Sequence, residues 1–156
     1  MISFKEIPEW WAVCPKQTCE RAEECLRYQA CRQAPEALAT WTCLLPHTPT
    51  GKACKHFQPY TTVKMARGLN AIYKDVHDKR ARADIRASLT GLFGSKGTYY
   101  RYKYGERQLN PQLQEKVRSI VNSFAPDAEV TFDETYDGYD FTRKVAMAES
   151  PRAWDE

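Results

Sequence analysis

The chain has 156 residues, enough for one hydrophobic core of ordinary domain size, and its 42% hydrophobic and 12% aromatic content exceeds that of a disordered chain. No run approaches the length of a membrane-spanning helix, and the start lacks the basic and apolar regions of an export signal. We therefore expect a folded cytoplasmic protein with no membrane partner.

The formal charge of +3 conceals a strong segregation along the chain. Residues 1–60 carry 7 basic and 6 acidic side chains, residues 61–118 carry 13 and 5, and residues 119–156 carry 3 and 9. A cationic middle attracts phosphates or acidic protein surfaces. The alternative is that the acidic C-terminal part lies across the middle and neutralises it within the chain.

All six cysteines fall between residues 14 and 54. In a chain without an export signal, such clustering favours metal-binding thiolates over disulfides, because the cytoplasm keeps thiols reduced. The spacing is not that of the paired C-x2-C knuckles of a zinc ribbon. Unligated buried thiols are the main alternative.

A geometric argument narrows the choice of ligands. Residues 20–34 have a helical composition and end at a proline. On one helix Cys25 and Cys31, six residues apart, would point roughly 120° away from each other. We therefore do not expect both to bind the same ion.

The predicted metal site consists of four thiolates from the turn before this helix, its beginning and the loop after residue 50: Cys14, Cys19, Cys25 and Cys54. Cys54 is preferred to Cys43, and His56 is a reserve ligand. Zinc, which takes four thiolates in closed structural sites, is the predicted metal, with an iron–sulfur cluster as the alternative. A closed site has no open coordination position, and no nucleophile–base pair stands out, so we expect no enzyme activity.

Apolar residues at helical spacing predict four helices between residues 61 and 126. The first runs from Thr61 to about His77 and the second from about Lys79 to Phe93. A third follows Gly94, and a fourth begins at Asn110-Pro111 and ends before Pro126. Residues 127–141 alternate in polarity and contain Asp-Gly, which predicts a short strand or hairpin, and residues 142–156 are expected to be flexible.

The third predicted helix lies in residues 93–107, FGSKGTYYRYKYGER, which contain four tyrosines and four basic residues. Ser95 is a plausible N-cap and Gly105 a plausible C-terminal stop. Tyr99 and Tyr102, three residues apart, would share a packing face, while the other side stays basic. The alternative is that all four tyrosines pack and the cations only solvate the surface.

The second and third predicted helices contain a recognisable pattern, Leu89, Thr90, Phe93 and Gly94 followed by Ser95, Thr98, Tyr99, Arg101 and Tyr102. With these residues, residues 61–124 resemble a repressor-type helix-turn-helix domain: the first four match its leucine, small residue, leucine and turn glycine, and the others match its later positions after one deletion. The resemblance implies DNA binding, with the groove and the phosphates contacted by Lys96, Tyr100, Arg101, Lys103 and Arg107. The deletion implies a different angle between the two helices. A non-enzymatic adaptor for an acidic protein partner is the alternative function.

A second set of residues extends over nearly the whole chain: Cys14, Cys19, Cys25-Leu26-Arg27, Cys54, Lys64-Met65-Ala66-Arg67-Gly68, Phe93-Gly94, Tyr99-Tyr100-Arg101, Gly105-Glu106-Arg107 and Tyr139-Asp140-Phe141. With these residues the chain resembles a family of uncharacterised proteins from gut Bacteroidales. The resemblance implies no activity, and it implies that Cys31 and Cys43 are not ligands.

These observations predict a mostly α protein with a helix-turn-helix-like core. We expect a metal-bound N-terminal module (1–60), a four-helix core (61–126), an acidic β appendage (127–141) and a flexible tail (142–156). The predicted function is nucleic-acid binding, with DNA as the polymer and regulation as the role, in a chain stabilised by zinc.

Overall fold

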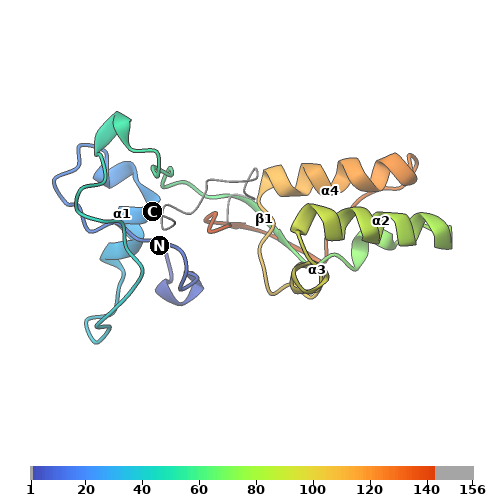
Figure 1. Ribbon diagram of the computed structural model, residues 1–156, viewed down its shortest axis with the longest axis horizontal. Helices are drawn as coiled ribbons and strands as arrows, with labels where there is room; N and C mark the ends of the chain where they lie inside the picture. The colour runs from blue at the N-terminus through green and yellow to red at the C-terminus, as the bar shows by residue number, and fades with distance from the viewer. Residues whose placement is uncertain (1, 143–156) are drawn as a thin grey trace, which may run out of the picture. The chain divides into compact units, whose positions relative to one another are not determined.

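A computed structural model describes residues 2–142 (Figure 1). Helices predominate among its regular elements, as predicted: α1 (Leu26–Arg32), α2 (Lys79–Phe93), α3 (Lys96–Lys103) and α4 (Pro111–Phe124). Strands β1 (Val63–Arg67) and β2 (Glu134–Gly138) pair in a two-stranded sheet. Among the helices described, none combines the length and the apolar character needed to span a bilayer. Apart from Thr142, the tail predicted to be flexible lies outside the described residues.

The chain forms two compact units. Unit 1 contains the residues up to Lys64 together with Asp137–Phe141, and unit 2 contains Met65–Tyr136 and Thr142. The chain passes from unit 1 to unit 2 within β1 and returns within β2.

Unit 1 consists of α1, short 3₁₀ turns and loops. Its hydrophobic core is small, with seven buried residues: Ile2, Ile7, Trp11, Val13, Leu26, Ala30 and Phe141. The unit is tied together by backbone hydrogen bonds between distant segments, including Val13 N–H to the Thr42 carbonyl at 3.0 Å.

The helix predicted for residues 20–34 is shorter than expected. Residues Ala22–Glu24 form a 3₁₀ turn, Cys25 is extended (φ −99°, ψ 121°), and α1 begins only at Leu26. The backbone around Cys25 pairs instead with the chain at residues 58–60, because Leu26 N–H donates to the Gln58 carbonyl (2.7 Å) and Tyr60 N–H donates to the Glu24 carbonyl (2.8 Å). Cys25 and Cys31 therefore do not lie within one helix, and the angle expected between them on a helix does not exclude Cys31 as a ligand.

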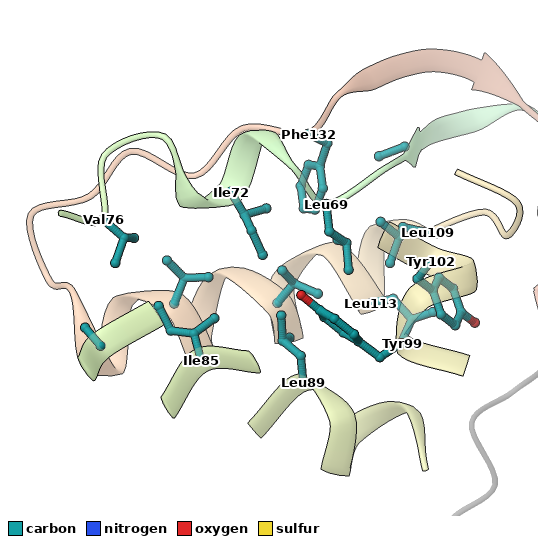
Figure 2. Packing of buried hydrophobic residues seen from close by; sticks show 14 residues of the cluster. Leu69, Ile72, Val76, Ile85, Leu89, Tyr99, Tyr102, Leu109, Leu113 and Phe132 are labelled. Atoms are coloured by element: carbon teal, nitrogen blue, oxygen red, sulfur yellow. The ribbon is translucent and has the colours of Figure 1, made fainter. Parts of the chain in front are cut away.

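Unit 2 packs α2, α3 and α4 around a core of fourteen buried residues. α2 and α4 lie side by side, and α3 lies at the end of α2 where that helix stops (Figure 1). Figure 2 shows the buried side chains of these helices meeting those of residues 69–76 and Phe132. The boundaries of α2 and α4 agree with the prediction, because their signals are local: Asp78 and Asn110 cap the N-termini, and Gly94 stops α2 at φ 88°.

The helix predicted from Thr61 to His77 is wrong. Those residues form β1, a turn at Gly68 (φ 81°) and a 3₁₀ turn at Ala71–Tyr73. Ala66 exchanges two backbone hydrogen bonds with Leu109, and β1 pairs with β2, so long-range pairing overrides the helical spacing. The core of residues 61–126 therefore has three α-helices, and β2 forms a pair with β1 instead of a hairpin.

Candidate metal centre and nucleic-acid interface

The four cysteines predicted to bind metal line one cavity in unit 1. Its free space is about 30 Å³, and Cys14, Cys19, Cys25 and Cys54 all contribute to its wall. His56 also lines it, whereas Cys31 and Cys43 are not among its lining residues. All six cysteines are free thiols.

Backbone hydrogen bonds between distant segments bring these cysteines together. Cys14 N–H donates to the Arg27 carbonyl at 3.0 Å, which places Cys14 beside the start of α1. Cys25 forms an antiparallel bridge with Pro59, five residues after Cys54. The Cys19 thiol accepts a hydrogen bond from Gly51 N–H at 3.4 Å. The positions of these cysteines depend on hydrogen bonds between segments that are far apart in the sequence, and the spacing of apolar residues does not predict such bonds.

Three cations also line the cavity: Lys16, Arg21 and Arg27. The Arg27 guanidinium lies 4.4 Å from the Trp11 ring centroid, and its Nε donates to the His56 carbonyl at 2.8 Å. Burial lowers the pKa of Arg27, and the nearby thiols of Cys25, Cys54 and Cys14 oppose that shift. The cavity thus combines sulfur donors with positive charge that would balance thiolates.

The four cysteines suit a metal by the chemistry of their thiols and by lining one cavity, but the structure does not gather the thiols around a single point. Within residues 2–142, no three Cys, His, Asp or Glu side chains are arranged closely enough around one point to hold an ion. The donor set nevertheless suits zinc or an iron–sulfur cluster, since both take four thiolates. An N–H donor to a thiolate, of the kind that Gly51 offers Cys19, is a usual outer-shell contact in such sites.

In unit 2, α3 begins and ends where the sequence predicts. The Ser95 hydroxyl accepts a hydrogen bond from Thr98 N–H at 3.1 Å, which caps the N-terminus. At the other end Gly105 (φ 79°) donates to the Tyr102 carbonyl (3.2 Å), and Glu106 N–H donates to the Arg101 carbonyl (2.9 Å). These two bonds form a Schellman motif, so both ends of this short helix are held firmly.

The four tyrosines of α3 and its C-cap divide into two pairs. Tyr99 and Tyr102 are buried, and both side chains join the core in Figure 2. Tyr102 stacks on Phe93 with ring centroids 4.2 Å apart. Tyr100 is half-buried, and Tyr104 is 66% exposed. The alternative that all four tyrosines pack in the core is therefore correct for Tyr99 and Tyr102, partly correct for Tyr100, and wrong for Tyr104.

The five residues predicted to contact nucleic acid all belong to α3 or the turn after it. Lys96 and Arg101 are exposed, while Tyr100, Lys103 and Arg107 are half-buried. Lys103 Nζ lies 5.7 Å from the Tyr100 ring centroid and 5.9 Å from that of Tyr104. Arg107 Cζ lies 5.9 Å from the ring centroid of Tyr102. Among the ion pairs of residues 2–142, none involves these four cations.

Two acidic residues of the C-terminal segment are engaged elsewhere. The Asp133 carboxylate accepts hydrogen bonds from the backbone N–H groups of Asn70 (3.2 Å) and Ala71 (2.7 Å). Asp137 pairs with Lys64 at 2.9 Å. The acidic segment therefore contacts the cationic middle at Lys64 and at residues 70–71, but within residues 2–142 it forms no ion pair with the cations of α3.

A groove beside α3 contains a basic residue that sequence reasoning did not select. Arg86 on α2 and Lys96 on α3 line an open groove of about 410 Å³, whose walls include Ala83, Ala87 and Thr90. The alanines, four residues apart on α2, leave the space open. The sequence feature that could have indicated this groove is the pair of small residues Ala83 and Ala87, one helical turn apart and close in sequence to the basic α3.

No curated protein and no solved structure matches the chain. The helix-turn-helix likeness and the Bacteroidales origin implied by the sequence resemblance stay predictions. One family model does match, over residues 1–141, and the chain belongs to that family of unknown function, DUF6078.

Proposed function

We propose that unit 2 binds nucleic acid through the exposed side of α3, with DNA as the first polymer to test. The observation that carries this proposal is the group of α3 cations that make no ion pair within residues 2–142, next to an exposed tyrosine. Unpaired Lys and Arg side chains attract phosphates, and aromatic rings add contacts with bases or sugars.

The charge distribution supports the same surface. Arg86 on α2 and Lys96 on α3 line a common groove, so the basic surface extends from α3 to the neighbouring helix. Such a surface raises the local concentration of a polyanion and makes binding dependent on salt. An acidic protein would respond to the same field, which is why the experiment must separate the two partners.

The test is fluorescence anisotropy with labelled DNA over a salt series. We expect affinity to fall steeply as salt rises, and Lys103→Ala to flatten that dependence by roughly one phosphate contact. Lys116→Ala, which removes an exposed cation from α4, is the matched control and should change the slope less. Wild-type protein without salt-dependent binding to DNA or RNA would refute the proposal and favour the adaptor function.

We also propose that unit 1 is stabilised by zinc held by Cys14, Cys19, Cys25 and Cys54. The proposal is supported by their common cavity and by its three cationic lining residues. Four thiolates and one Zn²⁺ carry a formal charge of about −2, which Lys16, Arg21 and Arg27 would balance. An iron–sulfur cluster remains the alternative occupant.

The small core of unit 1 gives zinc a structural role. Among the described residues, its cluster has seven buried members, against fourteen in unit 2, although the units are of similar length. A unit with so little buried apolar surface commonly depends on a metal or disulfides for stability. None of the six cysteines forms a disulfide in the described part of the chain, so we propose a metal as the stabilising device.

Elemental analysis of anaerobically purified variants tests this site. The Cys25→Ser variant should lose the metal, and the midpoint temperature of its thermal unfolding, followed by tryptophan fluorescence, should be lower than that of the wild type. Cys43→Ser is the matched control, because Cys43 is exposed and outside the cavity lining, and it should retain the metal. Wild-type protein purified without metal, or equal loss from both variants, would refute the assignment.

A further inference from the structure

The exposed side of α3 carries a pair of stacked rings. Tyr100 and Tyr104 lie 5.8 Å apart between ring centroids, with 19° between their planes. Tyr100 also packs edge-on against the buried Tyr99, at 5.2 Å. The inner ring is therefore anchored to the core, while Tyr104 is 66% exposed.

The position of Tyr104 is held by the backbone. It is the C-cap of α3, and its own N–H donates to the Tyr100 carbonyl at 2.9 Å. The Schellman motif at Gly105 follows directly, and Arg67 donates a hydrogen bond to the Gly105 carbonyl at 2.9 Å. The turn fixes the backbone from which the ring is presented, and stacking on Tyr100 orients the ring, which lowers the entropy cost when a ligand stacks on it.

Cations flank these rings on both sides. At about 100° per residue, and with Tyr99 and Tyr102 facing the core, Tyr104 lies near the centre of the outward face and Tyr100 lies about 50° to one side of it. Lys96 and Lys103 lie on one flank and Arg101 on the other. Lys103 Nζ is within 6 Å of both ring centroids, so a phosphate at Lys103 would lie beside a base stacked on Tyr104.

We infer that this surface binds unpaired bases of single-stranded nucleic acid, with one base stacked on Tyr104 and phosphates at Lys103 and in the Arg86–Lys96 groove. The inference rests on the proposed nucleic-acid binding and specifies its ligand. Proteins recognise the base edges of a duplex mainly through hydrogen bonds in its grooves. The faces of tyrosine rings instead stack on bases that are unpaired and unstacked. The outward centre of α3 offers ring faces.

The experiment compares three labelled 12-mers by anisotropy in low salt: single-stranded DNA of mixed sequence, single-stranded RNA and duplex DNA. We expect at least one single strand to bind about tenfold more tightly than the duplex. Tyr104→Ala should weaken single-strand binding by about tenfold, and Tyr104→Phe should retain it, because stacking needs the ring and not the hydroxyl. Phe124→Ala is the matched control, since Phe124 is a 41% exposed aromatic at the end of α4.

The outcomes separate this inference from the proposal beneath it. Arg86→Ala should lower the salt dependence of single-strand binding, and Lys116→Ala should not. Duplex binding as tight as single-strand binding, with no effect of Tyr104→Ala, would overturn the single-strand inference and leave nucleic-acid binding intact. Failure of all three 12-mers to bind would overturn both. Thermal melting of each variant establishes that it is folded.

Discussion

The hydroxyl oxygens of Tyr73 and Tyr99 lie 2.8 Å apart in unit 2. Tyr99 belongs to α3 and Tyr73 to the 3₁₀ turn after β1, so this hydrogen bond joins the helix with the candidate binding face to a segment of the core. Figure 2 shows the Tyr99 ring entering the cluster between α2 and α4, with its oxygen directed away from α3. Removing one hydroxyl leaves the other without this partner.

We predict that Tyr99→Phe lowers the free energy of unfolding by about 1 kcal/mol, because it leaves the half-buried Tyr73 hydroxyl unsatisfied. The double variant Tyr73→Phe/Tyr99→Phe should cost no more than the single change, since both polar groups are then absent. Urea unfolding followed by circular dichroism measures the three values. Additive costs would show that the two hydroxyls do not depend on each other.

The same pair predicts a pH dependence. Burial raises the pKa of both tyrosines above the ordinary value, and the hydrogen bond to Tyr99 raises the pKa of Tyr73 further. Above about pH 10 the unfolded chain releases these protons while the folded chain retains them, so the stability that the pair provides is present below that pH and is lost as pH rises. Between pH 9 and pH 11 the free energy of unfolding of the wild type should therefore fall more than that of the double Phe variant.

Gly68 and Asp133 form a second tightly fitted pair in unit 2. A Cβ atom at Gly68 would lie 2.2 Å from Asp133 Oδ2, and Gly68 has a φ of 81°. We predict that Gly68→Ala costs about 2 kcal/mol or more, from backbone strain and from displacement of the Asp133 carboxylate. Asp133→Ala should cost about 1–3 kcal/mol, because it removes the acceptor for the Asn70 and Ala71 N–H groups.

Glu134→Gln is the control for Asp133→Ala. Glu134 is the next residue, is exposed, and forms no ion pair within the described part of the chain. Its substitution should change the free energy of unfolding by less than about 0.5 kcal/mol. Equal effects at the two positions would mean that the carboxylate contacts of Asp133 contribute nothing specific.

The two glycines at the start of α3 predict opposite effects. Gly97 lies within the helix with nothing within 4 Å of an added Cβ atom, so Gly97→Ala should stabilise the protein by up to about 1 kcal/mol. Gly94 has an equally open surrounding but a φ of 88°, so Gly94→Ala should destabilise it by about 1 kcal/mol. Thermal melting of the two variants measures both signs, and stabilisation by Gly94→Ala would contradict the left-handed turn between α2 and α3.

Features of the fold that depend on contacts within a few residues could be predicted from the sequence, whereas features that depend on distant partners could not. Gly94, Ser95 and Gly105 determine the ends of α3 through contacts within a few residues, so its boundaries were predictable. The resemblance to a family of uncharacterised proteins was likewise confirmed. By contrast, Leu69, Ile72 and Val76 are buried as their spacing indicated, but they follow the turn at Gly68 and lie outside the α-helices. The strand β1 just before them is determined by distant partners, Leu109 and β2, which the spacing does not reveal.

The candidate sites show the same division. The four cysteines chosen from the sequence line one cavity, yet the argument used to exclude Cys31 assumed a helix through Cys25 that the pairing with residues 58–60 prevents. Arg86 was missed because its relevance depends on how α2 packs against α3. The exposure of Tyr104 depends on the turn at Gly105 and is not apparent from the tyrosine content alone.

Gly51 lies beside the candidate metal site, because its N–H donates to the Cys19 thiol. Gly51 has a φ of 64°, and an added Cβ atom would lie 2.0 Å from Glu20 Oε1. We therefore predict that Gly51→Ala destabilises unit 1 by about 1–3 kcal/mol, through backbone strain and displacement of the Glu20 side chain.

The double variant Gly51→Ala/Glu20→Ala separates these two causes. Because Glu20 is exposed and can move away, the double variant should recover only part of the lost stability, and the remaining loss measures the backbone strain. Three of the four tryptophans, Trp10, Trp11 and Trp41, belong to unit 1, so tryptophan fluorescence during urea unfolding reports mainly on this unit, with Glu20→Ala alone as the control. Full recovery in the double variant would show that the side-chain clash, and not the left-handed backbone, requires glycine beside Cys19.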